Sequence, residues 1–454
     1  MARGFVKQSL EERREMILNG DILKTLLFLS VPTLLMGVVQ AFIPIVDSFF
    51  LNHTSGYAVA AAVGFVVPII QMINGMSGGL GVAGMAMIGN ANGRGDIDMV
   101  KHYSTQLIVF GFIIGMVLAP LCLVSGYIVS KLINPEISQE VFVYMGLYSF
   151  VLPFLFLTAI YNAIKNSVGQ PEATLYRMIL LLILKIIFNT LYLHILDLGT
   201  VGSVLGSFSC YLCIGFWMYY DLFVKTSDLK LVLRGFSFDR EMIGEIMRLG
   251  VPAMLNSVTV NLGFVLINLE VQKYGGDVMN AQTIANNISS LYFLLPASLS
   301  TTVTTMVSMN IGVGETQRAK KSFFTACIVV IVFSALIIAI SLPFSKFLVG
   351  LFLTDTKMLS LAKDAVDIYT LAIIGFGIYM AVYGVFIGLG KTKIPLFTGL
   401  LRIWFFRYIF ILAFENILGV YSVFWGNLFS NTAAGLLCFL LVMKVEWRTN
   451  MRIS

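Results

Sequence analysis

The sequence predicts an all-α polytopic membrane protein with twelve transmembrane helices in two pseudo-symmetric six-helix lobes. Composition is the first observation behind this. Of 454 residues, 58% are hydrophobic and only 12% are charged, with a mean hydropathy of +0.89. Soluble domains carry roughly twice that charged fraction. The second observation is that apolar stretches long enough to span a bilayer, about 20 residues each, recur along the chain. The third is that its two halves match at a fixed offset.

Twelve apolar segments have the length of a membrane-spanning helix. They are predicted at 23–50, 57–84, 103–126, 140–164, 174–196 and 201–224, and at 243–270, 281–309, 322–350, 363–388, 395–415 and 420–444. We therefore expect an N-terminal segment at 1–22, six-helix lobes at 23–224 and 242–445, a linker at 225–241 and a tail at 446–454.

Basic residues predict how the chain is threaded through the membrane. They gather before the first span (Arg3, Lys7, Arg13, Arg14) and in the central linker (Lys225, Lys230, Arg234, Arg240), whereas the connections LNHTSG and ILDLGT have no lysine or arginine. Lysine and arginine favour the cytoplasmic side of a membrane. We expect the N-terminal segment, the linker and the tail to be cytoplasmic, in a multi-pass protein of a prokaryotic plasma membrane.

The second half repeats the first about 220 positions later. The matches are Leu29, Val31, Pro32 and Leu35 with Leu249, Val251, Pro252 and Leu255, and further on Asn90 with Asn310, Lys101 with Lys321 and Gly199 with Gly419. Six spans in each half give both halves the same orientation. An internal repeat of this kind is typical of transporters, with a substrate cavity between the lobes.

Asp47 is the first candidate functional residue. It lies in the apolar stretch 29–50, three residues after Pro44, which has no N–H and so frees the carbonyl of Gln40. A carboxylate within a membrane segment is costly and indicates function, although an acid at the end of a helix can also meet water. Gln40, seven residues earlier, shares the face of Asp47 and could supply an oxygen ligand. An acid in a low-dielectric cavity can hold a proton, a sodium ion or a cationic substrate in turn.

Two basic residues lie deep in predicted spans. Lys185 is in the fifth segment and either pairs with Asp47 or extends to the cytoplasmic interface. Arg407 is in the eleventh segment, where it is expected to line protein or a cavity; Arg402 is closer to the membrane surface. On the seventh segment, Asn261 and Asn268 share a face and are candidates for a cavity lining, the alternative being polar contacts between helices.

Composition also excludes several classes of function. The five cysteines lie in apolar runs, and the three histidines are widely spaced, so no metal centre is predicted, apart from a sodium ion at Asp47. A phosphate-binding GxxxxGK[ST] loop and an HExxH pair are missing from the sequence, which argues against ATP drive and against a membrane-embedded hydrolase. The net charge of +6 comes without basic clusters interleaved with aromatic residues, so nucleic-acid binding is not expected.

Four stretches carry a resemblance to a known family. They are VPTLLMGVVQAFIPIVDSFFLNHTSGYAVAAAVGF in the first hairpin, GNANGRGD and MNIGVGETQRAKKS after the second and eighth spans, and GLGKTKIPL between the tenth and eleventh. With twelve spans and a 6+6 repeat, the chain resembles the multidrug and toxic compound extrusion (MATE) transporters over nearly its whole length.

The resemblance implies a function and a site. Members of this family expel organic cations and other compounds using a sodium or proton gradient, and carry a functional aspartate on the first helix, where Asp47 stands. It also implies a role for Asn189 on the fifth helix. In one branch a second acid follows four residues later, but here that position is Leu193, which favours protons over sodium.

We therefore expect a secondary active antiporter, not an enzyme, that exports amphipathic, chiefly cationic, small molecules by alternating access. Its expected coupling ion is H⁺ or Na⁺, with no other cofactor. Its expected surroundings are the lipid bilayer, and it is expected to act as a monomer. The alternative is a flippase for a lipid-linked saccharide or another amphipathic lipid.

Overall fold

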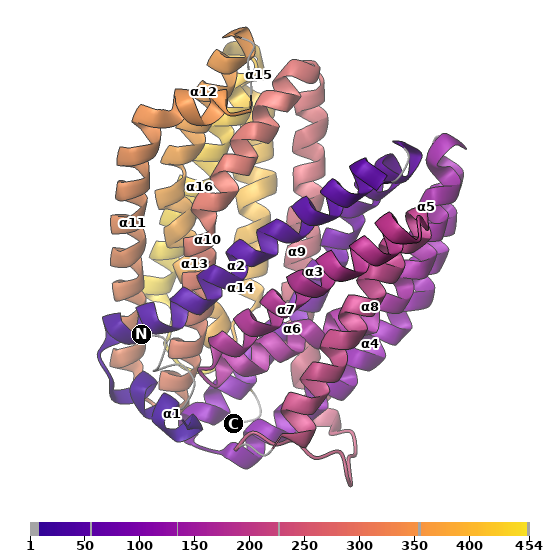
Figure 1. Ribbon diagram of the computed structural model, residues 1–454. Coiled ribbons are helices and arrows are strands. Elements are labelled where there is room, and N and C mark those ends of the chain that lie inside the picture. The colour runs from indigo at the N-terminus through magenta and orange to yellow at the C-terminus, as the bar shows by residue number, and fades with distance from the viewer. Residues whose placement is uncertain (1–8, 55–56, 134, 226–227, 353–355, 452–454) are drawn as a thin grey trace. The chain divides into compact units, whose positions relative to one another are not determined.

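The computed structural model describes residues 9–54, 57–133, 135–225, 228–352 and 356–451. The predictions that concern Arg3, Lys7 and the last three residues lie outside this part of the chain. The described residues form helices joined by short connections, and no β-strand occurs among them. Figure 1 shows these helices in chain order.

The helices fall into two compact units. Unit 1 comprises residues 1–15, 35–254 and 451–454, and unit 2 comprises residues 16–34 and 255–450. Two of the boundaries between units fall inside the first long helix of each half, namely α2 (Ile22–Thr54) and α9 (Arg240–Gln272). Leu35 and Leu255, the first residues after these boundaries, are the pair related by the 220-residue offset of the sequence repeat.

The remaining helices follow in order along the chain. Unit 1 holds part of α1 (Leu10–Asn19) and all of α3 (Tyr57–Arg94), α4 (Ile97–Leu132), α5 (Pro135–Tyr148), α6 (Leu152–Ser167), α7 (Pro171–Asn189) and α8 (Gly199–Tyr219). Unit 2 holds α10 (Gly276–Gly312), α11 (Thr316–Gly350), α12 (Thr356–Leu371), α13 (Ile373–Gly388), α14 (Lys393–Leu400), α15 (Phe410–Leu418) and α16 (Tyr421–Lys444).

The predicted twelve-span, all-helical fold class is confirmed. Eleven of the described helices are long and apolar enough to cross a membrane. A twelfth span results when the bent pair Met358–Leu371 and Ile373–Gly388 is taken together. Most observed helices extend beyond the predicted apolar segments because a helix ends at a turn signal rather than where hydrophobicity ends. α3, for example, runs on to Arg94, after which Gly95 has φ of +76° and Asp96 caps α4 by accepting from the Met99 N–H.

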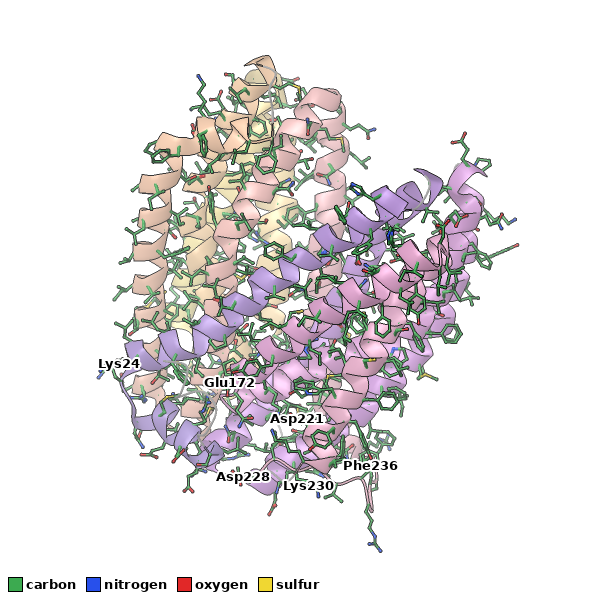
Figure 2. All side chains as sticks on the ribbon, in the orientation of Figure 1. Lys24, Glu172, Asp221, Asp228, Lys230 and Phe236 are labelled. Carbon is green, nitrogen blue, oxygen red and sulfur yellow. The ribbon has the colours of Figure 1, made fainter. Side chains whose placement is uncertain are left out.

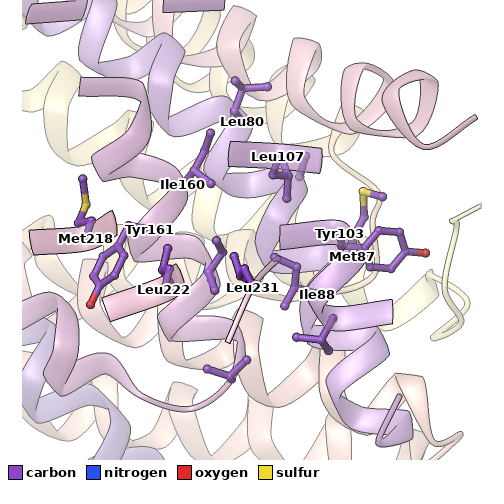
Figure 3. Packing of buried hydrophobic residues seen from close by; sticks show 14 of the residues in the cluster. Leu80, Met87, Ile88, Tyr103, Leu107, Ile160, Tyr161, Met218, Leu222 and Leu231 are labelled. Atoms are coloured by element: carbon purple, nitrogen blue, oxygen red, sulfur yellow. The ribbon is translucent and has the colours of Figure 1, made fainter. Parts of the chain in front are cut away.

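The interior of unit 1 is a cluster of buried apolar side chains from α3, α4, α6 and α8. Leu80, Leu107 and Ile160 are fully buried there, and Figure 3 shows them facing one another. The central linker contributes Leu231, whose N–H donates to the Leu222 carbonyl. The linker was predicted as a polar stretch, yet its Leu229 and Leu231 are buried against the helices of this unit.

Exposed apolar side chains form long stripes on the outer helices. On α11 they include Ile328, Val332, Leu336 and Ile340, which repeat every four residues and are each more than half exposed. A soluble protein would bury such a stripe, whereas in a bilayer it contacts lipid tails. Charged residues gather elsewhere: Glu172, Asp221 and Lys230 of unit 1 lie together near one end of the helices (Figure 2).

Three helical segments are of the π type, with hydrogen bonds to the fifth residue back. One of them, η3 (Thr190–Ile195), directly follows α7, and another, η5 (Leu401–Ile409), joins α14 to α15. These are the fifth spans of the two halves. π-helical turns are rare and are frequent at functional sites.

Candidate functional site

Asp47 of α2 and Lys185 of α7 form an ion pair inside unit 1. The Lys185 Nζ lies 2.9 Å from both carboxylate oxygens of Asp47 and 2.9 Å from Ser207 Oγ of α8. An ammonium group has three hydrogens to donate, and these three acceptors use them all. Of the two alternatives for Lys185, pairing with Asp47 or extending to the interface, the structure shows the pairing.

Asn189 completes the polar surroundings of Asp47. Its Nδ2 donates to Asp47 Oδ1 at 2.8 Å, and its side chain is 1% exposed. Asn189 lies one turn after Lys185 on α7, so both side chains reach the same carboxylate. Gly206 leaves space for the Asn189 side chain, because a Cβ at that position would lie only 2.8 Å from Asn189 Oδ1. The Oδ1 atom of Asn189 has no hydrogen-bond partner among the described residues.

The ion pair lines a cavity of about 370 Å³ within unit 1. Its wall is part polar and part aromatic, and includes Pro44, Asp47, Ser48, Gln71, Asn74, Tyr144, Tyr148, Lys185, Ser207 and Tyr211. The Asp47 side chain is 28% exposed, whereas that of Lys185 is 6% exposed. The carboxylate is therefore the member of the pair that a molecule in the cavity can reach.

The local sequence explains how these groups come together. α2 continues as one helix through Pro44 and carries Asp47 to the cavity wall. α7 ends at Asn189 and passes directly into the π-helical η3. Leu193, which occupies the position of the expected second acid, is 1% exposed in an apolar cluster of unit 1. A carboxylate at this position would be buried among apolar side chains, which disfavour its charge, whereas leucine packs with them.

The other sequence-predicted residues are not part of this cluster. Gln40 is exposed and is not among the residues that line the cavity. Asn261, Asn268 and Arg407 belong to unit 2. Asn261 donates to the Ser257 carbonyl of its own helix and Asn268 is exposed, while Arg407 is buried, with its Nη2 3.3 Å from the Tyr369 hydroxyl.

Sequence reasoning missed several residues of the cavity wall. Ser207 binds the ammonium group of Lys185, and Tyr144 and Tyr148 stack their rings at a centroid distance of 5.8 Å. The two tyrosines are spaced by one helical turn, as are Gln71 and Asn74 on α3. Polar or aromatic pairs at this spacing within apolar segments were the available signal.

A family model and known proteins match the chain along most of its length. The model described as MatE matches residues 32–191 and again residues 252–412, once in each half of the sequence repeat.

The chain belongs to the MatE family.

Relatives of this MatE chain include bacterial proteins of similar length. It is 25% identical over 389 residues to the probable multidrug resistance protein YoeA of Bacillus subtilis, covering 82% of this chain and 83% of YoeA. It is 21% identical over 440 residues to the multidrug export protein MepA of Staphylococcus saprophyticus, covering 95% of each chain.

Solved structures share the fold of this MatE chain. An outward-facing multidrug resistance MATE family transporter superposes with a TM-score of 0.87 at 20% identity, covering 94% of this chain and 96% of the other. A MOP superfamily transporter from Pyrococcus furiosus gives a TM-score of 0.88 at 20% identity, covering 96% and 98%. The resemblance seen in the sequence is thus confirmed, and the chain is a multi-pass membrane protein of a transporter family, which is generally not a family of enzymes.

Proposed function

We propose that this protein is a secondary active multidrug efflux transporter of a prokaryotic plasma membrane, driven by protons through Asp47. Membership of the MatE family and similarity to the multidrug export protein MepA and the probable multidrug resistance protein YoeA support the export of organic compounds. The observation that carries the coupling assignment is the Asp47–Lys185 pair on the wall of the 370 Å³ cavity.

The ion pair is a switch with two protonation states. With Asp47 ionised, its charge cancels that of Lys185, and Asn189 donates a further hydrogen bond to it. Protonation of Asp47 removes the negative charge, so Lys185 loses its counter-ion and keeps Ser207 as a neutral partner. A buried ammonium group without a counter-ion is costly, which makes the two states prefer different arrangements of the helices that carry these residues. Such a preference is what converts proton binding into a conformational change.

Protons suit this site better than sodium ions. A hard cation takes several oxygen ligands at short distances, including carboxylate oxygens. Here the ammonium group of Lys185 already lies against both oxygens of Asp47, in the place that a sodium ion would need. Leu193 supplies no further carboxylate. A proton needs only one oxygen of Asp47 and no coordination sphere.

The cavity wall suits amphipathic compounds. Aromatic rings of Tyr144, Tyr148 and Tyr211 offer flat apolar faces, and Gln71 and Asn74 offer hydrogen bonds. An organic cation is attracted to aromatic faces and can approach the partly exposed carboxylate of Asp47, where it competes with Lys185. Amphipathic, chiefly cationic compounds are the substrate class that we propose. The flippase alternative is not favoured, since the relatives YoeA and MepA are named for multidrug resistance and multidrug export.

The experiment is uptake of a fluorescent organic cation into proteoliposomes, with a proton gradient and a sodium gradient imposed separately. We expect transport to follow the proton gradient, and Asp47→Asn to abolish it while the protein still inserts. Asp228→Asn, which removes an exposed carboxylate of the linker, is the matched control and should transport normally. Full activity of Asp47→Asn, or transport that follows sodium alone, would refute the coupling assignment.

A further inference from the structure

Unit 2 contains two buried arginines for which the proposed function has no use. Arg402 and Arg407 lie on the π-helical η5 and are 8% and 4% exposed. They are five residues apart, which in a π-helix brings two side chains close to the same side. Ionised residues within membrane segments are rare and mark functional sites.

The partners of Arg402 are neutral. Its Nη1 donates to Asn431 Oδ1 of α16 at 3.0 Å, and its guanidinium carbon lies 4.9 Å from the ring centre of Tyr379 and 5.5 Å from that of Phe376. Asn431 in turn donates from Nδ2 to Asn427 Oδ1 at 2.8 Å. The Nε atom of Arg402 is buried and has no hydrogen-bond partner among the described residues.

The partners of Arg407 are neutral as well. Its guanidinium group faces the rings of Phe264 and Tyr369 at 5.5 and 5.9 Å, and its Nη2 donates to the Tyr369 hydroxyl at 3.3 Å. Its Nε is also buried and without a partner among the described residues. Each arginine thus has one N–H donor, at Nε, that makes no hydrogen bond to the described residues. The aromatic faces stabilise the positive charge less than a carboxylate would.

Acids of unit 2 are engaged elsewhere. Glu270 pairs with Lys273, Asp367 pairs with Lys363, and Asp364 accepts from the Tyr421 hydroxyl. Within the described part of the chain, none of the ion pairs includes Arg402 or Arg407. Buried charges in proteins are ordinarily paired. These two guanidinium groups have no carboxylate partner among the described residues, so we expect their counter-ion to come from outside the chain.

We propose that Arg402 and Arg407 form a binding site for a small oxyanion, of the carboxylate or phosphate class. A guanidinium group presents a planar fork that matches two oxygens of such an anion, and the free Nε atoms extend the fork of each residue. The anion supplies the negative charge that neither arginine finds among the described residues. All the residues named for this site belong to unit 2, whereas the residues that line the Asp47 cavity belong to unit 1.

The test is titration of the purified full-length protein, in neutral detergent, with potassium acetate, potassium phosphate and potassium chloride in parallel. Isothermal calorimetry measures binding, and the thermal unfolding midpoint measures stabilisation. We expect saturable binding of acetate or phosphate and a weaker effect of chloride, which cannot engage the fork with two oxygens. Arg407→Met should weaken this binding at least tenfold, and Arg407→Lys, which keeps the charge but not the fork, should weaken it less.

Arg448→Met is the matched control, because that arginine is 78% exposed and pairs with Glu446. It should bind the anions like the wild type, and it also corrects for ionic strength. If Arg407→Met does not fold, the Lys variant and the wild type still decide the question. The proposal fails if no anion binds saturably to the wild type. It fails equally if binding is unchanged in the Arg407 variants, which would leave the aromatic rings and Asn431 as the whole environment of the arginines.

Discussion

Stability of the Asp47–Lys185 pair can be measured with a double-mutant cycle. Removing one member of a buried ion pair costs about 3–5 kcal/mol, because the other charge is left uncompensated. In Lys185→Met the remaining charge is Asp47, which is 28% exposed and keeps the Asn189 hydrogen bond, so water offsets part of the loss. We expect a cost of about 2 kcal/mol for this variant.

Asp47→Asn should cost more, about 3 kcal/mol, because the stranded ammonium group is only 6% exposed. The double variant Asp47→Asn with Lys185→Met leaves no charge and should cost about 2 kcal/mol, for a coupling energy of about 3 kcal/mol. Denaturant titration followed by tryptophan fluorescence gives the free energies of unfolding.

The exposed linker residues provide the control for this cycle. Asp228→Asn, Lys230→Met and their double variant should each change the free energy of unfolding by less than about 0.5 kcal/mol. Additive costs for Asp47 and Lys185, with a coupling energy below about 0.5 kcal/mol, would refute the ion pair as a working unit. So would a larger cost for Lys185→Met than for Asp47→Asn.

Two further predictions concern the same site. Lys185→Met clears the ammonium group from the Asp47 oxygens, so transport in proteoliposomes should become responsive to a sodium gradient; a variant that stays indifferent to sodium contradicts the blocking role of the lysine. Gly206→Ala places a Cβ 2.8 Å from Asn189 Oδ1 and should lower the initial transport rate severalfold, whereas Gly146→Ala, whose Cβ meets nothing within 4 Å, should transport normally; equal rates in the two would show that Asn189 tolerates displacement.

Most of the fold could be predicted from the sequence because the bilayer imposes a length on each apolar segment. Hydropathy gave the spans, and the 220-residue offset gave the two halves. The interruptions could not be predicted, since they depend on packing. The 3₁₀ turn Ser149–Val151 divides the predicted fourth span into α5 and α6, and α12 and α13 meet at a bend of 40° within the predicted tenth.

The candidate site was predictable only in part. A carboxylate in an apolar segment points to Asp47 by cost alone, and Lys185 stands out for the same reason. Whether the two side chains meet depends on the distance between α2 and α7, and the residue spacing within one helix gives no information about that distance. Ser207 and the cavity tyrosines carry no charge, so they gave no comparable signal. Asn268 was predicted to line a cavity because it shares a helical face with Asn261, but its side chain is exposed.

Duplication explains why the two halves have corresponding helices, but it does not explain where their buried charged residues lie. At the 220-residue offset Asp47 corresponds to Ile267, which is fully buried in the apolar core of unit 2, and Lys185 corresponds to Phe405. Arg407 corresponds in turn to Ile187, so neither unit repeats these buried charges of the other. Unit 1 thus holds the Asp47–Lys185 ion pair, and unit 2 holds two buried arginines without a carboxylate partner among the described residues. Each unit therefore offers a different chemistry, the first for cations and the second for oxyanions. Comparing the transport of organic cations and organic anions in the wild type and in Arg407→Met tests whether the second unit affects substrate choice, and equal transport of both classes by the two proteins would show that it does not.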